Sequence, residues 1–138
     1  MGIASVIQNS AKADLLRAGT NFNTSGGTPA GHAFKLALYL STTTIDTTTT
    51  AYGGPTNEVA TATGYTGGGK ALTNTGVGTT TVTSFTDFSD LSWTSSSFTT
   101  RGCLIYNTTA ITGLTTNRAV CSIDFGGDKT VSSGTFTI

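Results

Sequence analysis

Charged residues are scarce in this chain of 138 residues: Lys, Arg, Asp and Glu make up 10% of it and sum to a formal net charge of zero. An ordinary soluble domain has about 25% charged residues. Because the seven basic residues are scattered, the chain lacks the basic patch by which proteins bind nucleic acid. Zero net charge also removes the repulsion that keeps many proteins monomeric, so the composition favours association with other proteins.

Cysteine and histidine are equally scarce, with two Cys and one His. Two cysteines do not make a disulfide scaffold, and neither a CxxC pair nor a Cys/His spacing for zinc is present. We expect Cys103 and Cys121 to be buried free thiols, with one strand-bridging disulfide as the alternative. The single His32 lies among Gly and Ala and has no catalytic Ser/His/Asp or Cys/His pattern around it, so we interpret it as a loop residue.

Long apolar runs are absent. No stretch approaches the 18 or so consecutive apolar residues that a membrane helix needs, so no membrane partner is expected. The first residues, MGIASVIQNSAKADLLRAG, have neither a basic start nor a continuous apolar stretch, so they do not read as a signal peptide. We therefore expect a soluble chain made in the cytoplasm.

Thr, Ser, Gly and Asn take the place of the missing charges, which suits β-structure. The clearest pattern is Ser97–Asp128, in which two runs rich in β-branched and aromatic residues flank a polar connection. The first run is apolar on both faces, as in a central strand. In the second, Ala119, Cys121, Ile123 and Phe125 share one face, and Val120, Ser122 and Asp124 share the other, as in a half-buried strand. An antiparallel hairpin of the two would place Cys103 opposite Cys121.

One helix is predicted, over Ser5–Ala18. Val6, Ile7, Ala11 and Leu15 recur at helical spacing and form an apolar stripe. Ser5 is a suitable N-cap, and Gly19 stands where a helix end is expected.

Further strands are expected before and after the central pair. Ala33–Ser41 should place Phe34, Leu36, Leu38 and Leu40 on one face and Lys35, Ala37 and Tyr39 on the other. Asp87–Trp93 should enter the core through Phe88, Leu91 and Trp93. The other strand candidates are Asn57–Thr63, Ala71–Thr73, Thr79–Phe85 and Gly134–Ile138. We predict a mainly β protein: residues 1–23 as an N-terminal α-helix and arm, and residues 24–138 as a single antiparallel β-sandwich or barrel-like domain.

The segment Gly64–Lys70, GYTGGGK, has the Gly and Lys spacing of a phosphate-binding P-loop. The next residue is Ala71, where that loop needs a Ser or Thr hydroxyl. A strand, not a helix, is predicted to follow, so no helix N-terminus would face the phosphates. We therefore assign no nucleotide site.

The remaining polar candidates have structural explanations. Asp87 with Asp90 and Asp124 with Asp128 fit turns better than a metal or a hydrolase carboxylate pair. Arg101 is expected to pair with Asp87, Asp90 or Glu58, or to reach a neighbouring subunit. Tyr39, Tyr52, Tyr65 and Tyr106 could form a sugar-stacking platform, although core or interface packing is the commoner use. We assign no catalytic, cofactor-binding or metal-binding residue and expect no enzyme activity.

Several segments carry a resemblance to a known group of proteins. They are FKLALY (34–39), NEV (57–59), RGCLIYN (101–107) and DFGGDK (124–129), within a likeness that runs from about Leu15 to Ile138. In these the chain resembles a group of small virion proteins of tailed bacteriophages. The resemblance implies a non-enzymatic structural component of the particle, located in the virion after assembly in the host cytoplasm.

Three functions compete under this resemblance. The first is a capsid decoration or cement protein that bridges major capsid subunits. The second is a tail or fibre component with a host-receptor or glycan-binding face, and the third is a glycan hydrolase. We favour the first, with self-association as a homotrimer. The expected contact elements are Met1–Asn23, Thr42–Pro55 and Gly64–Gly69.

Overall fold

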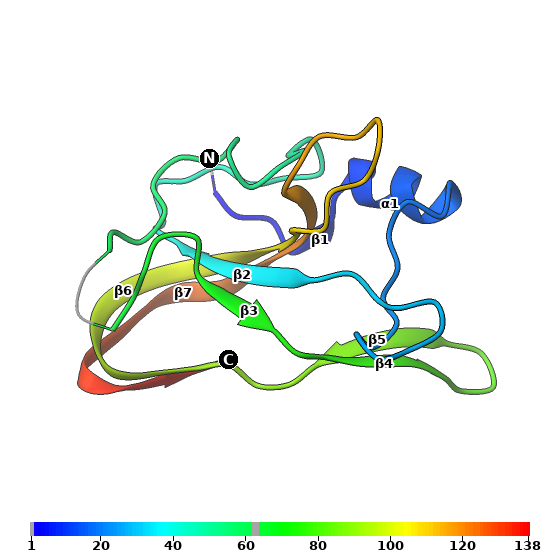
Figure 1. The fold of residues 1–138 in the computed structure, drawn as a ribbon. Helices are drawn as coiled ribbons and strands as arrows, with labels where there is room; N and C mark the ends of the chain where they lie inside the picture. The colour runs from blue at the N-terminus through cyan, green and yellow to red at the C-terminus, as the bar shows by residue number, and fades with distance from the viewer. Residues whose placement is uncertain (1, 62–63) are drawn as a thin grey trace.

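Two long antiparallel strands, β6 (Ser92–Asn107) and β7 (Arg118–Thr137), form the centre of the fold in the computed structural model, which describes residues 2–61 and 64–138. They pair along most of their length, and four register shifts interrupt the ladder. Because each bulge bends and twists its strand, the pair curls over on itself (Figure 1).

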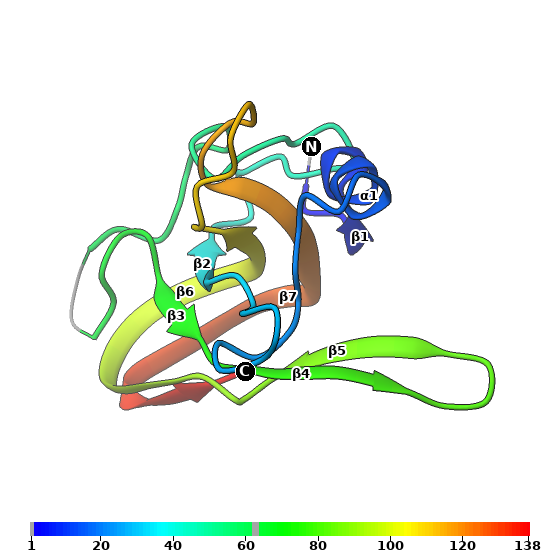
Figure 2. The same ribbon diagram turned by 45° about the vertical axis from the view of Figure 1, so that its right-hand side comes forward.

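The other strands extend this pair into a five-stranded antiparallel sheet of order β1-β7-β6-β2-β3. Its remaining members are β1 (Val6–Ile7), β2 (Phe34–Tyr39) and β3 (Lys70–Leu72). β4 (Asn74–Thr79) and β5 (Ser84–Phe88) form a separate hairpin that projects from the body (Figure 2). Over the described residues, the prediction of a mainly β, sandwich-like antiparallel domain with one N-terminal helix is confirmed.

The sheet buries apolar side chains on both faces. Phe34, Leu36 and Leu38 of β2 join Trp93 and Phe98 of the curled β6 in one cluster. Ala37 and Tyr39 join the second cluster on the opposite face, which the N-terminal segment and residues 42–55 cover; its other members are Ile3, Ile45, Leu104, Tyr106 and Ala119. The predicted faces of β2 are therefore confirmed, and β6 is apolar on both faces as a central strand should be.

The helix is shorter than predicted. α1 spans Asn9–Leu16, and Val6–Ile7 pairs with Cys121 and Ser122 of β7 as a strand. β-branched residues favour the strand, and Gln8, not Ser5, is the N-cap. The prediction of Leu15 as a buried stripe residue is wrong: it is 48% exposed, and Ala11 and Asp14 are the buried residues. Gly19 does close the helix end, donating its N–H to the Asp14 carbonyl at 2.6 Å.

Two strand predictions are wrong. In Asn57–Thr63, residues 57–61 contain a single bridge, between Tyr39 and Glu58, and residues 62 and 63 lie outside the described residues. Thr79–Phe85 is not one strand, because residues 80–83 form the turn between β4 and β5. Thr80 N–H donates to the Thr83 carbonyl at 2.7 Å, and a Thr-rich segment supplies such local bonds as readily as strand pairing.

The predicted faces of β7 are also wrong in part, and a bulge explains why. Ile105 pairs with Cys121 and Tyr106 pairs with Ala119, which leaves Val120 as an extra residue. Ala119 and Cys121 therefore pack in different clusters, and Val120 is buried beside Cys121.

The same register separates the two cysteines. Cys103 pairs with Ile123, whereas Cys121 pairs with Ile105, so the predicted opposition of Cys103 and Cys121 is wrong. Both cysteines are free thiols, which agrees with the preferred prediction and not with the alternative of a disulfide.

Candidate interaction surfaces

The N-terminal segment contacts the rest of the fold at three points. Ile3 is buried and bridges Ile45. The Gln8 side chain is fully buried and donates to Ser122 Oγ at 2.9 Å. Asp14 is 1% exposed and forms an ion pair with Arg118 at the start of β7. Within the described residues of this predicted contact element, the exposed side chains are those of Ser5 and Ile7, of the outer surface of α1, and of Arg17 and Ala18 after the helix.

The loop Thr42–Pro55 lies between the N-terminal segment and the start of β7 (Figure 1). Ile45 exchanges backbone hydrogen bonds with the Gly2–Ala4 segment, and Tyr52 N–H donates to the Asn117 carbonyl at 2.8 Å. Thr43 and Ile45 are fully buried. What the loop exposes is uncharged; the exposed residues are Thr42, Thr44, Thr48, Thr50, Gly53 and Gly54.

The loop Gly64–Gly69 cannot cradle a phosphate in this conformation. The Gly67 amide donates to Thr61 Oγ1, the Gly68 amide to Glu58 Oε1 and the Gly69 amide to the Thr66 carbonyl. β3 follows, with no helix at this point. Gly69 has φ +66°, and a Cβ there would meet the Leu36 carbonyl, so glycine serves the close approach of this loop to β2.

Glu58 is the centre of a tyrosine cluster. Its carboxylate accepts hydrogen bonds from Tyr52 Oη at 2.6 Å, Tyr65 Oη at 2.7 Å and the Gly68 amide at 2.6 Å. Tyr106 Oη donates to the Gly68 carbonyl at 2.7 Å, and its ring stacks on Tyr52 with the ring centroids 4.6 Å apart. The carboxylate and the rings thereby fix the loop Gly64–Gly69 against the sheet.

The chemistry of this cluster is structural. Burial first, and the Glu58 carboxylate in addition, raise the pKa of the Tyr52 and Tyr65 phenols, and raise that of Tyr106 to about 12. The phenols therefore stay protonated and donate, and none is a nucleophile near neutral pH. Tyr39, Tyr65 and Tyr106 are buried, so the core-packing interpretation of the tyrosines is confirmed and the sugar-stacking platform is not formed.

Arg101 pairs with Asp124, so the predicted pairing with Asp87, Asp90 or Glu58 is wrong. Arg101 Nε lies 2.7 Å from Asp124 Oδ1, across the β6–β7 pair. The guanidinium, together with the Gly126 amide, holds the pKa of the Asp124 carboxyl below its usual range. Asp87 Oδ1 accepts from the Phe88 amide at 2.9 Å, but the residue lies in β5 and not in the turn that was predicted. This Arg–Asp pair fixes strand register.

His32 contacts a neighbouring amide side chain and does not belong to a metal-binding group of the described residues. His32 Nδ1 lies 2.8 Å from Asn107 Nδ2, and burial lowers the pKa of the imidazole. Among residues 2–61 and 64–138, no group of three His, Cys, Asp or Glu side chains is placed to hold a metal ion. The same residues contain no helix with the length and hydropathy needed to cross a membrane.

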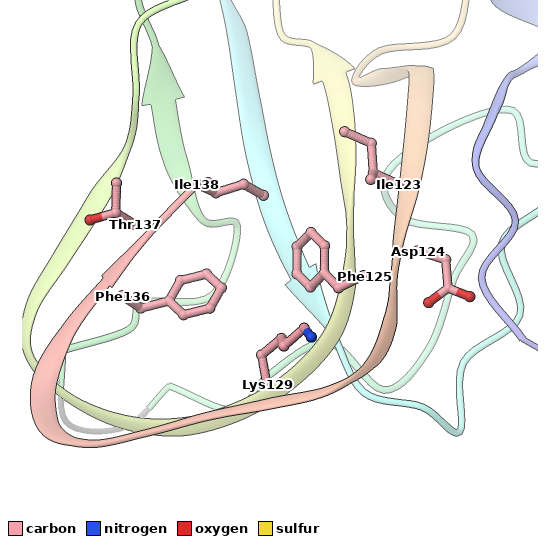
Figure 3. Close-up of a pocket in the computed structure, with 7 residues that line it drawn as sticks. All are labelled: Ile123, Asp124, Phe125, Lys129, Phe136, Thr137 and Ile138. Carbon is pink, nitrogen blue, oxygen red and sulfur yellow. The ribbon is translucent and has the colours of Figure 1, made fainter.

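An apolar groove lies along the end of the curled sheet (Figure 3). It has a volume of about 470 Å³, and Phe125, Phe136 and Ile138 point toward the same space, whereas Asp124 points away. A second hollow of about 190 Å³ shares Ile123 and Ile138 with it, and its lining includes Phe88, Asp87 and Asp90. We call the two together the C-terminal groove.

Large apolar side chains are exposed on α1 and on the β4–β5 hairpin, in addition to Ile7 of β1 and Ile123 of β7. Leu16 of α1 and Val82 at the hairpin turn are each 91% exposed. Leu15 is 48% exposed, and Val77 and Phe85 of the hairpin are 60% and 50% exposed.

Comparison with known proteins gives no match: no family model, no curated protein and no solved structure is similar to this chain.

Proposed function

We propose that this chain is a non-enzymatic structural protein of a tailed-phage virion, where it acts as a capsid decoration protein that bridges major capsid subunits. The observation that carries the proposal is the exposure of Leu15, Leu16, Val77, Val82 and Phe85 on a chain with so few charges. Groups of exposed large apolar residues mark surfaces that other proteins cover.

The architecture supports a function in binding. Three of the segments that carry the resemblance to phage virion proteins lie in strands that build the fold: FKLALY is β2, RGCLIYN is the C-terminal part of β6, and DFGGDK lies in β7. Two of the carboxylates that could serve catalysis have other partners, since Glu58 holds the tyrosines and Asp124 holds Arg101.

Lattice binding suits a domain with small contact elements. A stable interface buries about 1,200–2,000 Å² in total, and repetition over a capsid converts modest contacts into avidity. The projecting β4–β5 hairpin, the outer surface of α1 and the uncharged residues of Thr42–Pro55 are the contact elements in this proposal.

The test is the copy number of the chain in purified virions, measured by quantitative mass spectrometry against the major capsid protein. A decoration protein should be present in numbers comparable to the capsomers. A few copies per particle would assign it to the tail or fibre instead, and absence from purified virions would overturn the virion assignment.

A further inference from the structure

The outer surface of α1 is apolar and basic. Leu16 and Leu15 are exposed, and Lys12 and Arg17 are exposed on the same helix end. The acid of the helix, Asp14, faces inward and is held by Arg118; Arg17 reaches it only at 4.0 Å. An incoming surface would therefore meet leucine side chains flanked by positive charge.

The C-terminal groove has the complementary character. Its lining is apolar, and the exposed carboxylates of Asp87 and Asp90 lie at one end. Within the described residues, neither acid has a basic side chain within 4.0 Å. Lys129 lies at the other end of the groove, and the carboxylate of Asp124 is already paired with Arg101.

α1 cannot reach the groove of its own chain. Figures 1 and 2 place α1 at one end of the molecule and the C-terminus, beside which Ile138 lines the groove, at the other. The helix is anchored there by β1 and by the Asp14–Arg118 ion pair, so it cannot swing across.

We propose that α1 of one copy docks into the C-terminal groove of a second copy, with Leu15 and Leu16 on the apolar lining and Lys12 and Arg17 facing Asp87 and Asp90. The contact joins two different surfaces, so it is heterologous, and repetition closes it into a ring or extends it into a chain. The outer surface of α1 then serves self-association, which leaves the β4–β5 hairpin and the loop Thr42–Pro55 for the capsid contact.

The β4–β5 hairpin is the other exposed apolar element, and it fits the groove less well. It has no basic residue to face the two acids. Its apolar side chains also lie on opposite faces. Phe85 pairs with Gly78 and covers it, whereas Val77 belongs to the adjacent cross-strand pair with Thr86, whose side chains point to the other face. Charge complementarity therefore selects α1, and the hairpin provides a matched control.

The first experiment measures the mass of the full chain in solution by light scattering and native mass spectrometry over a range of concentrations. Wild type should form an oligomer. Leu16→Lys should weaken association about tenfold or more, since burying one leucine contributes roughly that factor or more. Val82→Lys, the same change at an equally exposed residue, should leave association unchanged.

The second experiment uses the two-surface character of the contact. Asp87→Lys/Asp90→Lys should also dissociate the oligomer. Mixing this variant with Leu16→Lys should restore a 1:1 dimer, because the mixture contains one intact helix and one intact groove. Combining Lys12→Glu/Arg17→Glu with Asp87→Lys/Asp90→Lys in one chain should restore part of the association. Circular dichroism checks that each variant is folded.

A wild-type chain that stays monomeric up to high concentration would overturn the inference. So would an oligomer that neither variant weakens, or one that Val82→Lys dissociates equally. A monomer that still occurs in many copies per virion would leave the decoration proposal standing, so the two failures are distinguishable.

Discussion

Glu58 shows how a single residue can look catalytic and be structural. A carboxylate among four tyrosines suggests acid–base chemistry, but here it accepts three hydrogen bonds and holds the loop Gly64–Gly69 on the sheet. Hydrogen bonds to a charged group are stronger than those between neutral groups. The cluster therefore contributes to stability and occupies most of the acceptor capacity of the carboxylate.

We predict that Glu58→Gln lowers the free energy of unfolding by about 1–3 kcal/mol. The NH₂ group of the glutamine would face a hydrogen-bond donor of the cluster, and the negative charge that strengthens the other hydrogen bonds would be lost. Urea unfolding followed by tyrosine fluorescence measures this change. Asp90→Asn, an exposed carboxylate, is the control and should change stability by less than about 0.5 kcal/mol. Equal stability of Glu58→Gln and wild type would contradict the structural role.

Because the two thiols are buried, we predict that the stability of the fold decreases at alkaline pH. Burial raises the pKa of Cys103 to about 12 and that of Cys121 to about 11, from an ordinary value of 9.0. Below pH 9 the thiols are protonated in both the folded and the unfolded chain, so their contribution to the free energy of unfolding is fully present. As the pH rises from 9 toward 11, thiols ionise in the unfolded chain only, so stability falls by about 1 kcal/mol per thiol by pH 10.

Urea unfolding at pH 7 and pH 10 checks this. The double variant Cys103→Ala/Cys121→Ala should show a smaller loss between the two pH values than wild type. An identical loss in both proteins would assign the alkaline effect to the tyrosines alone.

At the scale of elements, the N-terminal segment and the projecting hairpin differ in how they depend on the rest of the fold. The ion pair between Asp14 and Arg118 is almost fully buried and joins α1 to β7. Removing one partner of such a pair leaves the other charge uncompensated. We predict that Asp14→Ala costs about 3 kcal/mol of stability, measured by thermal or urea unfolding. Lys12→Ala, on the exposed side of the same helix, is the control and should leave the free energy of unfolding nearly unchanged. An unchanged stability of Asp14→Ala would contradict the role of this ion pair in anchoring α1.

The hairpin should be dispensable for folding. β4 and β5 pair only with each other, and an isolated two-stranded hairpin contributes little to a separate core. Replacing Val77–Thr86 by Asn-Gly keeps Asn74 and Phe88 in place, and should leave the melting temperature within a few degrees of wild type. Binding to virions that lack the chain, measured by co-sedimentation, should be lost. Unfolding of this variant, or undiminished binding, would contradict the assignment of the hairpin as a contact element.

The helix and the strands also show which parts of the fold could be predicted from the sequence. β2 and the centres of β6 and β7 were predictable because each has an apolar alternation that a strand must bury. The bulge at Val120, the strand Val6–Ile7 and the turn at Thr80–Thr83 were not, because each depends on a partner strand or a local hydroxyl bond that no one-dimensional pattern contains. The tyrosine cluster was equally hidden, because Glu58 reaches Tyr52 and Tyr65 only through its bridge to Tyr39 of β2 and the folding of the two flanking loops.

At the scale of the whole molecule, the chain is a neutral β-domain whose apolar residues exceed what its own core covers. Its internal ion pairs, Asp14–Arg118 and Arg101–Asp124, fix elements and strand register. Its exposed leucines, valines and phenylalanine lie on the two elements that project from the sheet (Figure 2). We propose that a protein built in this way acts by the contacts it makes, and that the assembly supplying them is the virion to whose proteins its segments show a resemblance.

The most direct measurement of that claim is a cryo-electron microscopy reconstruction of virions that carry a fused tag on this chain. The account predicts tag density repeated over the capsid lattice, with the β4–β5 hairpin at the junctions between major capsid subunits. Tag density confined to the tail would reject the decoration function, and a reconstruction without any tag density would contradict a virion function altogether.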